Sequence, residues 1–175
     1  MELRTEVIRF GTGSAAVWTD KSGEIHRALL GGEPPSLRTP ATIETGSPAS
    51  SAARALLDYF NGAPADLCSL PISGEVLDPI GTFRRRIEDE LRKVGSGEMV
   101  SYGELAARAG NPRAARAVGA IMRTNPVPLF IPCHRVIGST GELVGFTGGM
   151  EWKIYLLSLE GIIVRGMKVI WKINE

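Results

Sequence analysis

Residues 100–123 read VSYGELAARAGNPRAARAVGAIMR, and this stretch decides how the second half of the chain folds. Ser101 and Glu104 stand three residues apart. At this spacing a helix-capping serine and a glutamate satisfy each other's backbone N–H groups. The spacing predicts a helix over residues 102–109, and Gly110 is suited to end it.

A second helix is expected directly after this turn. Asn111 is suited to cap it and Pro112 to occupy its first position, where a missing N–H group does no harm. The helix is predicted to run to about Arg123. Two helices joined by a tight turn that contains glycine form the helix-turn-helix layout, which many helical proteins share.

The sequence before this pair divides into a β part and a further helix. Strand-like runs cover residues 3–10, 15–19 and 24–30, with a hairpin turn at residues 20–23 between the last two. Residues 31–46 are rich in Gly, Pro and Thr and are expected to form a loop.

Ser47 and Pro48 are suited to begin a helix that Asn61 and Gly62 close. Residues 63–80 contain three prolines and are interpreted as a linker between subdomains. A third helix is predicted by apolar residues at helical spacing, namely Phe83, Ile87, Leu91 and Val94.

The sequence after the pair leads to a cysteine. Residues 129–131 are apolar, are expected to be buried, and deliver Cys133 to a fixed place. A glycine-rich loop (138–149) and a helix (150–159) follow, and residues 162–164 and 168–172 suit a hairpin. We expect a subdomain with its linker over 1–78, a second domain over 79–161, and a tail over 162–175.

Charge is unevenly distributed along the 175 residues. The net charge is only +1, yet residues 81–135 carry ten basic and five acidic side chains, whereas residues 1–80 carry six and ten. The basic stretch suits a polyanionic partner, but on charge alone a solvated helix face is the favoured interpretation. No apolar run is long enough to span a bilayer, and the charged N-terminus does not resemble a signal peptide, so we expect an intracellular protein.

The two cysteines, Cys68 and Cys133, and the two histidines, His26 and His134, do not form a zinc-binding pattern. No metal is therefore expected. In an intracellular protein both thiols should be free. Cys68 and His26 are interpreted as packing residues, and Lys153 as a solvated helix residue rather than a phosphate contact.

Cys133 stands out from its neighbours. A free cysteine is most often a small buried apolar residue. Here a His-Arg pair follows it, and nearby positive charge favours the thiolate. A cysteine beside cations on a stiff loop is typical of a nucleophile. Because adjacent side chains on an extended chain point apart, His134 is expected to take the thiol proton through a water, with Glu160 as its orienting acceptor.

Residues 131–136, IPCHRV, resemble the active-site motif of the O6-alkylguanine-DNA alkyltransferases, or methylated-DNA–protein-cysteine methyltransferases. The resemblance extends over about residues 80–161, in matching order and spacing. Its other segments are Val100–Ala106, Gly110–Gly119, Asn125–Pro128, Gly148-Gly149, Lys153 and Leu159–Gly161.

The resemblance implies an α/β (α+β) fold. Its N-terminal subdomain is RNase H-like with antiparallel strands, and its helical C-terminal subdomain carries a winged-helix-like helix-turn-helix. It implies direct-reversal repair without a cofactor, in which a monomer moves one alkyl group from O6-alkylguanine, or O4-alkylthymine, in double-stranded DNA onto Cys133. Such an enzyme turns over once. Its expected location is the cytoplasm, on the nucleoid, or in a nucleus.

The resemblance also assigns roles to residues of this chain. The catalytic set is Cys133, His134, Glu160 and Asn125. Guanine and its alkyl group would be held by Tyr102, Met122, Val136, Phe146, Thr147 and Gly148. DNA would be contacted by Arg116, Ala114, Ala115, Asn111, Ser101, Gly119, Arg123 and Arg135.

The small residues of the second helix fit these roles. A helix that reads the major groove usually carries long polar side chains, whereas a smooth helix suits the narrow minor groove. Arg116 would fill the gap left by a flipped nucleotide. The open alternative is a buried Ala-rich helix with Arg116 in solvent. Some relatives have tyrosine at the position of Phe146 and serine at that of Thr147.

Two other functions compete. A non-catalytic alkyltransferase-like lesion sensor binds the same damage, but such proteins lack the cysteine that stands here at 133. A cysteine hydrolase would need a Cys-His pair that meets in space, and such residues are rarely adjacent in sequence.

Overall fold

The computed structural model describes residues 2–37, 39–44, 48–77 and 82–170. The strands are β1 (Arg4–Phe10), β2 (Gly13–Thr19), β3 (Ile25–Gly31), β4 (Thr42–Glu44), β5 (Val100–Ser101), β6 (Val136–Ile137), β7 (Ile163–Arg165) and β8 (Lys168–Ile170). The α-helices are α1 (Ser51–Phe60), α2 (Phe83–Arg92), α3 (Tyr102–Arg108), α4 (Ala115–Arg123) and α5 (Met150–Leu159), and the 3-10 turns are η1 (Leu67–Ser69) and η2 (Cys133–Arg135).

The N-terminal part is an antiparallel sheet with strand order β3-β2-β1-β4. Its first three strands confirm the prediction, and the backbone N–H of Gly23 donates to the carbonyl of Asp20 across the predicted hairpin turn. The predicted loop over residues 31–46 is wrong in one place, because residues 42–44 form strand β4. Three residues within a stretch rich in Gly and Pro are too few to give a strand pattern.

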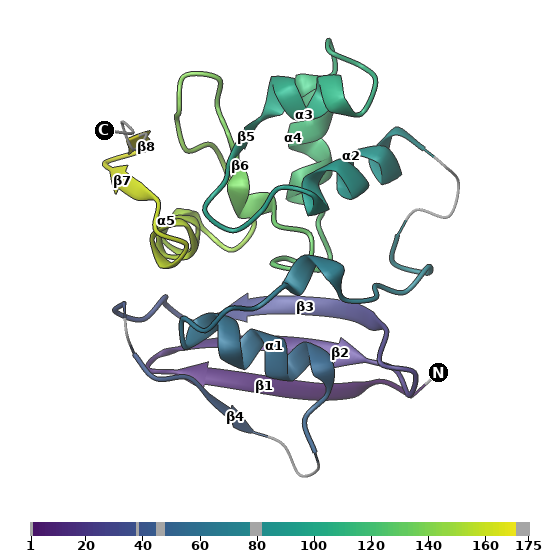
Figure 1. The fold of residues 1–175 in the computed structure, drawn as a ribbon, viewed down its shortest axis with the longest axis vertical. Helices are drawn as coiled ribbons and strands as arrows, with labels where there is room; N and C mark the ends of the chain where they lie inside the picture. Colours follow the sequence, from purple (N-terminus) through teal and green to yellow (C-terminus); the bar gives the residue numbers. More distant parts are fainter. Residues whose placement is uncertain (1, 38, 45–47, 78–81, 171–175) are drawn as a thin grey trace.

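Helix α1 packs on the sheet and buries its apolar stripe, in front of the strands in Figure 1. The predicted start at Ser47 and Pro48 is wrong, because Ser50 is the N-cap and its side chain accepts from the N–H of Ala53. Ser47 itself lies outside the described residues. The predicted end is confirmed, since Asn61 caps the helix and Gly62 takes a left-handed φ of 74°.

The segment interpreted as a linker is built into the edge of the sheet. Backbone hydrogen bonds join Ile25 of β3 to Pro71 and Ser73, and the segment includes η1. Its last residues, 78–80, and with them the expected domain boundary, lie outside the described residues.

Helices α2, α3 and α4 form the layer above the sheet in Figure 1. The capping box of Ser101 and Glu104 is present at the start of α3, as predicted. The predicted start of α4 is wrong. The N–H of Ala114 donates to the carbonyl of Asn111, which closes a turn over Pro112, so that the helix begins only at Ala115.

The C-terminal part confirms the predicted helix over residues 150–159, which is α5. The predicted hairpin is present as β7 and β8, paired from Ile163 with Ile170 to Arg165 with Lys168. The expected strand residues 171 and 172 lie outside the described residues. Backbone bonds from Leu143 to Met167 and from Val169 to Gly141 tie this hairpin to the glycine-rich loop.

One aromatic cluster joins the two parts. Phe10 of β1 lies 4.3 Å from Phe60 of α1 and 5.8 Å from Trp152 of α5, measured between ring centroids. The indole N–H of Trp152 donates to the carbonyl of Gly32 after β3. The architecture confirms the expected α/β class with antiparallel strands and a helical C-terminal part. Among the described residues, no helix is long and apolar enough to cross a membrane.

Candidate active site around Cys133

Cys133 opens the 3-10 turn η2, directly after the predicted buried run. Leu129, Phe130 and Ile131 are all buried, and Leu129 has a left-handed φ of 76°. A branched side chain rarely adopts this backbone conformation, and such strain is held only where surrounding contacts fix the chain. The thiol is itself 4% exposed. The buried, strained loop therefore holds Cys133 in a fixed position.

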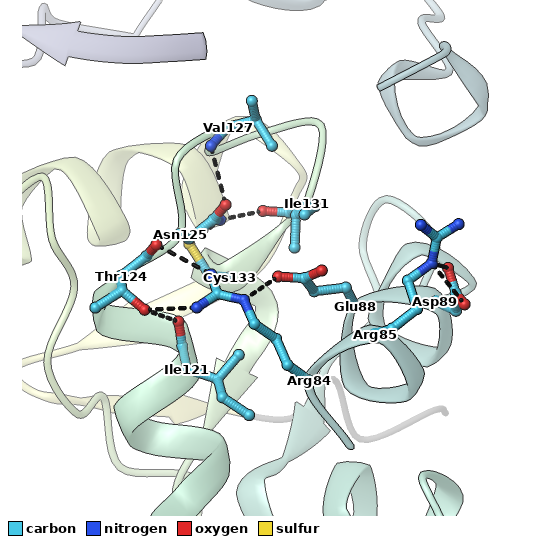
Figure 2. A network of polar contacts seen from close by, with 10 residues as sticks. All are labelled: Arg84, Arg85, Glu88, Asp89, Ile121, Thr124, Asn125, Val127, Ile131 and Cys133. Carbon is cyan, nitrogen blue, oxygen red and sulfur yellow. Dashed lines mark hydrogen bonds and ion pairs between the residues drawn. The ribbon is translucent and has the colours of Figure 1, made fainter. Parts of the chain in front are cut away.

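Asn125, which the resemblance placed in the catalytic set, holds the loop before Cys133 in position. Its side-chain Nδ2 donates to the carbonyl of Ile131 at 2.8 Å and to Sγ of Cys133 at 3.0 Å, and its Oδ1 accepts from the N–H of Val127 at 3.1 Å (Figure 2). All three bonds of the amide lie within one loop. The side chain thus fixes the sulfur relative to the backbone of the loop that precedes it.

A clamp from α2 holds the residue before Asn125. Two nitrogens of Arg84 donate to Thr124, to Oγ1 at 3.0 Å and to the carbonyl at 3.1 Å, while Nε donates to Glu88 at 2.8 Å (Figure 2). Glu88 is 2% exposed, and its Oε2 has no partner among the described residues. No local pattern in the sequence indicated this clamp, because Arg84 and Thr124 stand 40 residues apart.

Burial raises the pKa of the Cys133 thiol to about 11, although the amide of Asn125 and the charge of Lys153 act to lower it. The thiol is therefore protonated near neutral pH, and the cations expected to favour its thiolate do not outweigh burial. A nucleophilic role for this sulfur requires a group that takes its proton.

His134 is the neighbouring base. Its ring is buried, and Nε2 lies 2.9 Å from Oε1 of Glu160, so the orienting contact expected from the sequence is present. Nδ1 is buried without a partner among the described residues. Burial lowers the pKa of His134, against the opposing charge of Glu160, so the ring is neutral at pH 7. A neutral imidazole whose far nitrogen meets a carboxylate is suited to accept a proton.

Arg135 lies inside the protein, and the expectation that it contacts DNA is wrong. Its guanidinium donates to both oxygens of Glu160, at 2.7 and 3.0 Å, and to the carbonyl of Val94 at 2.6 Å. Burial acts to raise the pKa of Glu160, but His134 and Arg135 together hold it well below 4.5. Arg135 keeps this carboxylate ionised, and its partners are too distant in sequence to reveal that role.

Lys153 also corrects the sequence interpretation, since its side chain is fully buried. Nζ donates to the carbonyls of Val136 at 2.6 Å and Val144 at 2.9 Å, and burial lowers its pKa to about 8. The hydroxyl of Tyr102 donates to the same carbonyl of Val144 at 3.2 Å. The lysine fixes two backbone carbonyls beside the cysteine and has no solvated role.

A cavity of about 450 Å³ opens at the sulfur. Of the residues expected to bind guanine, Phe146, Thr147 and Gly148 line it together with Cys133 and Asn125, whereas Tyr102, Met122 and Val136 are not among its lining. The hydroxyl of Thr147 donates to the carbonyl of Arg123 at 2.9 Å. The opposite wall comes from residues 26–30 of β3, which no sequence pattern led us to expect.

The residues expected to contact DNA differ in their exposure to solvent. Asn111, Arg116 and Arg123 are exposed on or beside α4, and Ser101, Ala114, Ala115 and Gly119 are partly exposed. Val118 and Met122 form the buried side of this helix. The small residues of this helix are half-buried or exposed, so the alternative of a buried Ala-rich helix is wrong, and the helix presents a smooth face with Arg116 in solvent.

Asp20, Glu24 and His26 are the described residues whose ligand atoms gather as a metal site would require. Oδ1 of Asp20 already accepts from Ser22 and from the N–H of Glu24, and Oδ2 lies 3.0 Å from Nε2 of His26. These bonds close the β2–β3 hairpin, which gives His26 the structural role that the sequence interpretation assigned to it.

Comparisons with known proteins agree with this geometry. Residues 82–162 match the family model described as 6-O-methylguanine DNA methyltransferase, DNA binding domain. Over 105 residues the chain is 46% identical to the methylated-DNA–protein-cysteine methyltransferase of Haemophilus influenzae, covering 59% of this chain and 56% of that one. The chain thus spans little more than half the length of this curated relative.

Two solved structures extend the likeness to both parts of the fold. The R37L variant of the Mycobacterium tuberculosis O6-methylguanine methyltransferase shares 30% identity with a TM-score of 0.69, covering 91% of this chain and 93% of that one. The Mycobacterium tuberculosis OGT in complex with DNA shares 28% identity with a TM-score of 0.63, covering 89% and 92%. From the thiol, its neighbours and these matches together, we conclude that the chain belongs to the methylated-DNA–protein-cysteine methyltransferase family.

Proposed function

We propose that this protein repairs alkylated DNA by moving the alkyl group from O6 of guanine, or O4 of thymine, irreversibly onto Sγ of Cys133. The observation that carries the proposal is the surroundings of the sulfur. The thiol lines a cavity of about 450 Å³, accepts a hydrogen bond from Asn125 at 3.0 Å, and precedes a histidine that is bonded to a buried carboxylate. Membership of the family and the DNA complex of a relative support it.

The transfer is an in-line displacement. An electron pair of Sγ forms the new S–C bond while the C–O6 bond breaks and leaves its pair on guanine. The thiol proton passes through a bridging water to Nδ1 of His134, whose Nε2 then donates to Glu160. Guanine takes up a proton from water as it leaves, and His134 returns its proton to water, so the overall reaction converts thiol and alkylated base into thioether and normal base. Because the thioether is stable, each molecule acts once.

The flipped base would be held by groups on both sides of the sulfur. In this proposal Tyr102 donates to the guanine ring and the backbone N–H of Thr147 to O6, which stabilises charge on the leaving base. The carbonyls of Cys133 and Val136 read its amino group. Met122 and Phe146 provide an apolar wall, and Gly148 leaves room beside them because an added Cβ would lie 2.9 Å from Phe146.

DNA would be gripped through its minor groove by α4. The smooth face of Ala114, Ala115 and Gly119 suits close approach, and the exposed Arg116 fills the gap left by the flipped nucleotide. Ser101, Asn111 and Arg123 would contact the backbone, so binding should weaken with salt and depend little on sequence. The protein acts as a monomer in this scheme.

Quantitative analysis of the bases in the DNA tests the proposal. A short duplex with one O6-methylguanine is mixed with increasing amounts of the protein, and the remaining lesion is counted. We expect one lesion lost per protein molecule, and none with Cys133→Ala. Loss of the lesion with Cys133→Ala would overturn the proposal, as would tight lesion binding by the unaltered protein without any loss, which identifies a sensor.

A further inference from the structure

Oε1 of Glu160 contacts hydrogen-bond donors from three side chains inside the protein. It accepts from Arg135 at 2.7 Å, lies 2.9 Å from Nε2 of His134, and accepts from the hydroxyl of Tyr59 at 2.9 Å. The side chain of Glu160 is 1% exposed. Its position, and with it that of the His134 ring, is therefore decided by these partners, since water does not compete for it.

Tyr59 is the partner that comes from the other part of the fold. It lies on α1, which packs on the N-terminal sheet, and it stands 101 residues before Glu160. Its side chain is buried and its ring meets that of Phe60 edge-on, at 5.3 Å and 83°. Burial, together with the charge of Glu160, raises the pKa of Tyr59 well above 10, so the hydroxyl keeps its proton and remains a donor.

A neutral donor has an advantage at this carboxylate. When His134 takes up a proton it becomes a cation, and the charge of Arg135 opposes that change. The hydroxyl of Tyr59 orients Oε1 without adding a positive charge beside the imidazole. The titratable and charged groups that face Glu160 are His134 and Arg135 from η2 and Tyr59 from α1, and Cys68 lies behind Arg135 at 3.6 Å.

We propose that Tyr59 is a positioning residue for alkyl transfer, whose hydroxyl holds Oε1 of Glu160 where it orients His134 toward the proton of Cys133. The inference rests on the proposed transfer to Cys133. Through the hydrogen bond from Tyr59 to Glu160, the N-terminal part of the chain affects the rate of transfer in the C-terminal part.

The test compares two tyrosines that are equally buried. Tyr59 and Tyr155 are each 7% exposed, but the described residues include no hydrogen-bond partner for the hydroxyl of Tyr155. Single-turnover transfer from an O6-methylguanine duplex is followed as a function of DNA concentration. For Tyr59→Phe we expect the limiting rate constant to fall about tenfold, the effect of one hydrogen bond to a charged group. The DNA concentration for half-maximal rate should not change, and Tyr155→Phe should match the unaltered protein.

A second measurement separates positioning from a general loss of structure. Because Tyr59 acts through Glu160, Tyr59→Phe should have no further effect on transfer in a Glu160→Gln background. Equal slowing in both backgrounds, or unchanged transfer in Tyr59→Phe alone, would overturn the inference while the proposed function stands. Absence of transfer by the unaltered protein would instead overturn the proposed function and the inference with it.

Discussion

Two carboxylates are buried in opposite parts of this molecule, Glu6 in the sheet and Glu160 after α5. Glu6 accepts from the backbone N–H of Ser50 at 2.9 Å and pairs with Arg4 at 3.0 Å, so it ties the start of α1 to β1. Glu160 instead accepts from His134, beside the thiol, and from Arg135. Burial of a charge therefore does not identify a catalytic site. The hydrogen-bond donors of the carboxylate identify the site. The donors to Glu6 anchor helix α1, whereas Glu160 contacts His134, the base beside the thiol.

Among the substitutions that keep Cys133, the largest effect should follow from Glu160→Gln. The amide cannot balance the buried guanidinium of Arg135, and it cannot stabilise a protonated His134 as a carboxylate does. We expect transfer to slow at least about 100-fold and the free energy of unfolding to fall by about 3 kcal/mol. Single-turnover kinetics and urea unfolding measure the two effects. Transfer at the unaltered rate would show that Glu160 is merely an anchor, as Glu6 is.

Substitutions in the clamp on Thr124 test whether this contact supports transfer by Cys133 or only stabilises the fold. Arg84→Met leaves Glu88 buried without its partner and should lower the free energy of unfolding by about 2 to 3 kcal/mol. Adding Glu88→Leu should restore most of that stability, because the unpaired acid is gone. Transfer should remain slow in the double variant, since Thr124 is still released. Recovery of both properties together would show that the clamp serves folding alone.

Lys153 offers a test by pH, since burial lowers its pKa from 10.5 to about 8. Between these values the unfolded chain binds more protons than the folded one, so the free energy of unfolding rises with pH. Relative to Lys153→Met, the unaltered protein should become more stable from pH 8 to 9, by about 1 kcal/mol. Urea unfolding of both proteins at the two pH values measures this difference in the free energy of unfolding. A difference that does not vary with pH would mean that Lys153 is charged in the fold as it is in water.

The smallest effect on transfer is expected for Glu6→Gln, the counterpart of the first substitution. The amide oxygen still accepts from the N–H of Ser50, and the partly exposed Arg4 loses its ion pair with residue 6. The free energy of unfolding should fall by about 1 to 2 kcal/mol. Transfer per folded molecule should be unchanged. A loss of transfer comparable with that of Glu160→Gln would contradict the division between the two carboxylates.

Local patterns in the sequence predicted the features that depend on neighbours along the chain. The capping box of Ser101 and Glu104, the span of α5 and the tail hairpin are of this kind. The contact of His134 with Glu160 was expected because a histidine that takes a proton needs an orienting acceptor, and the family resemblance assigns both residues to the catalytic set.

Features fixed by distant partners were missed or misread. The burial of Arg135 and Lys153 depends on carbonyls and a carboxylate from other elements. Tyr59 lies on a helix whose sequence shows only an apolar stripe, and nothing near it indicates Glu160, 101 residues away. The start of α4 was misplaced because Pro112 suits both a helix start and a turn, and the bond from Ala114 to Asn111 selects the turn.

The most direct test of the central role of Cys133 is the intact mass of the protein after reaction with a duplex containing O6-methylguanine. Transfer adds one methylene unit, about 14 Da, to a single site per molecule, because the thiol becomes a thioether. We predict that peptide mapping places the whole gain on the peptide with Cys133 and none on the peptide with Cys68. A gain on any other residue, or repaired DNA with an unchanged protein mass, would contradict the account.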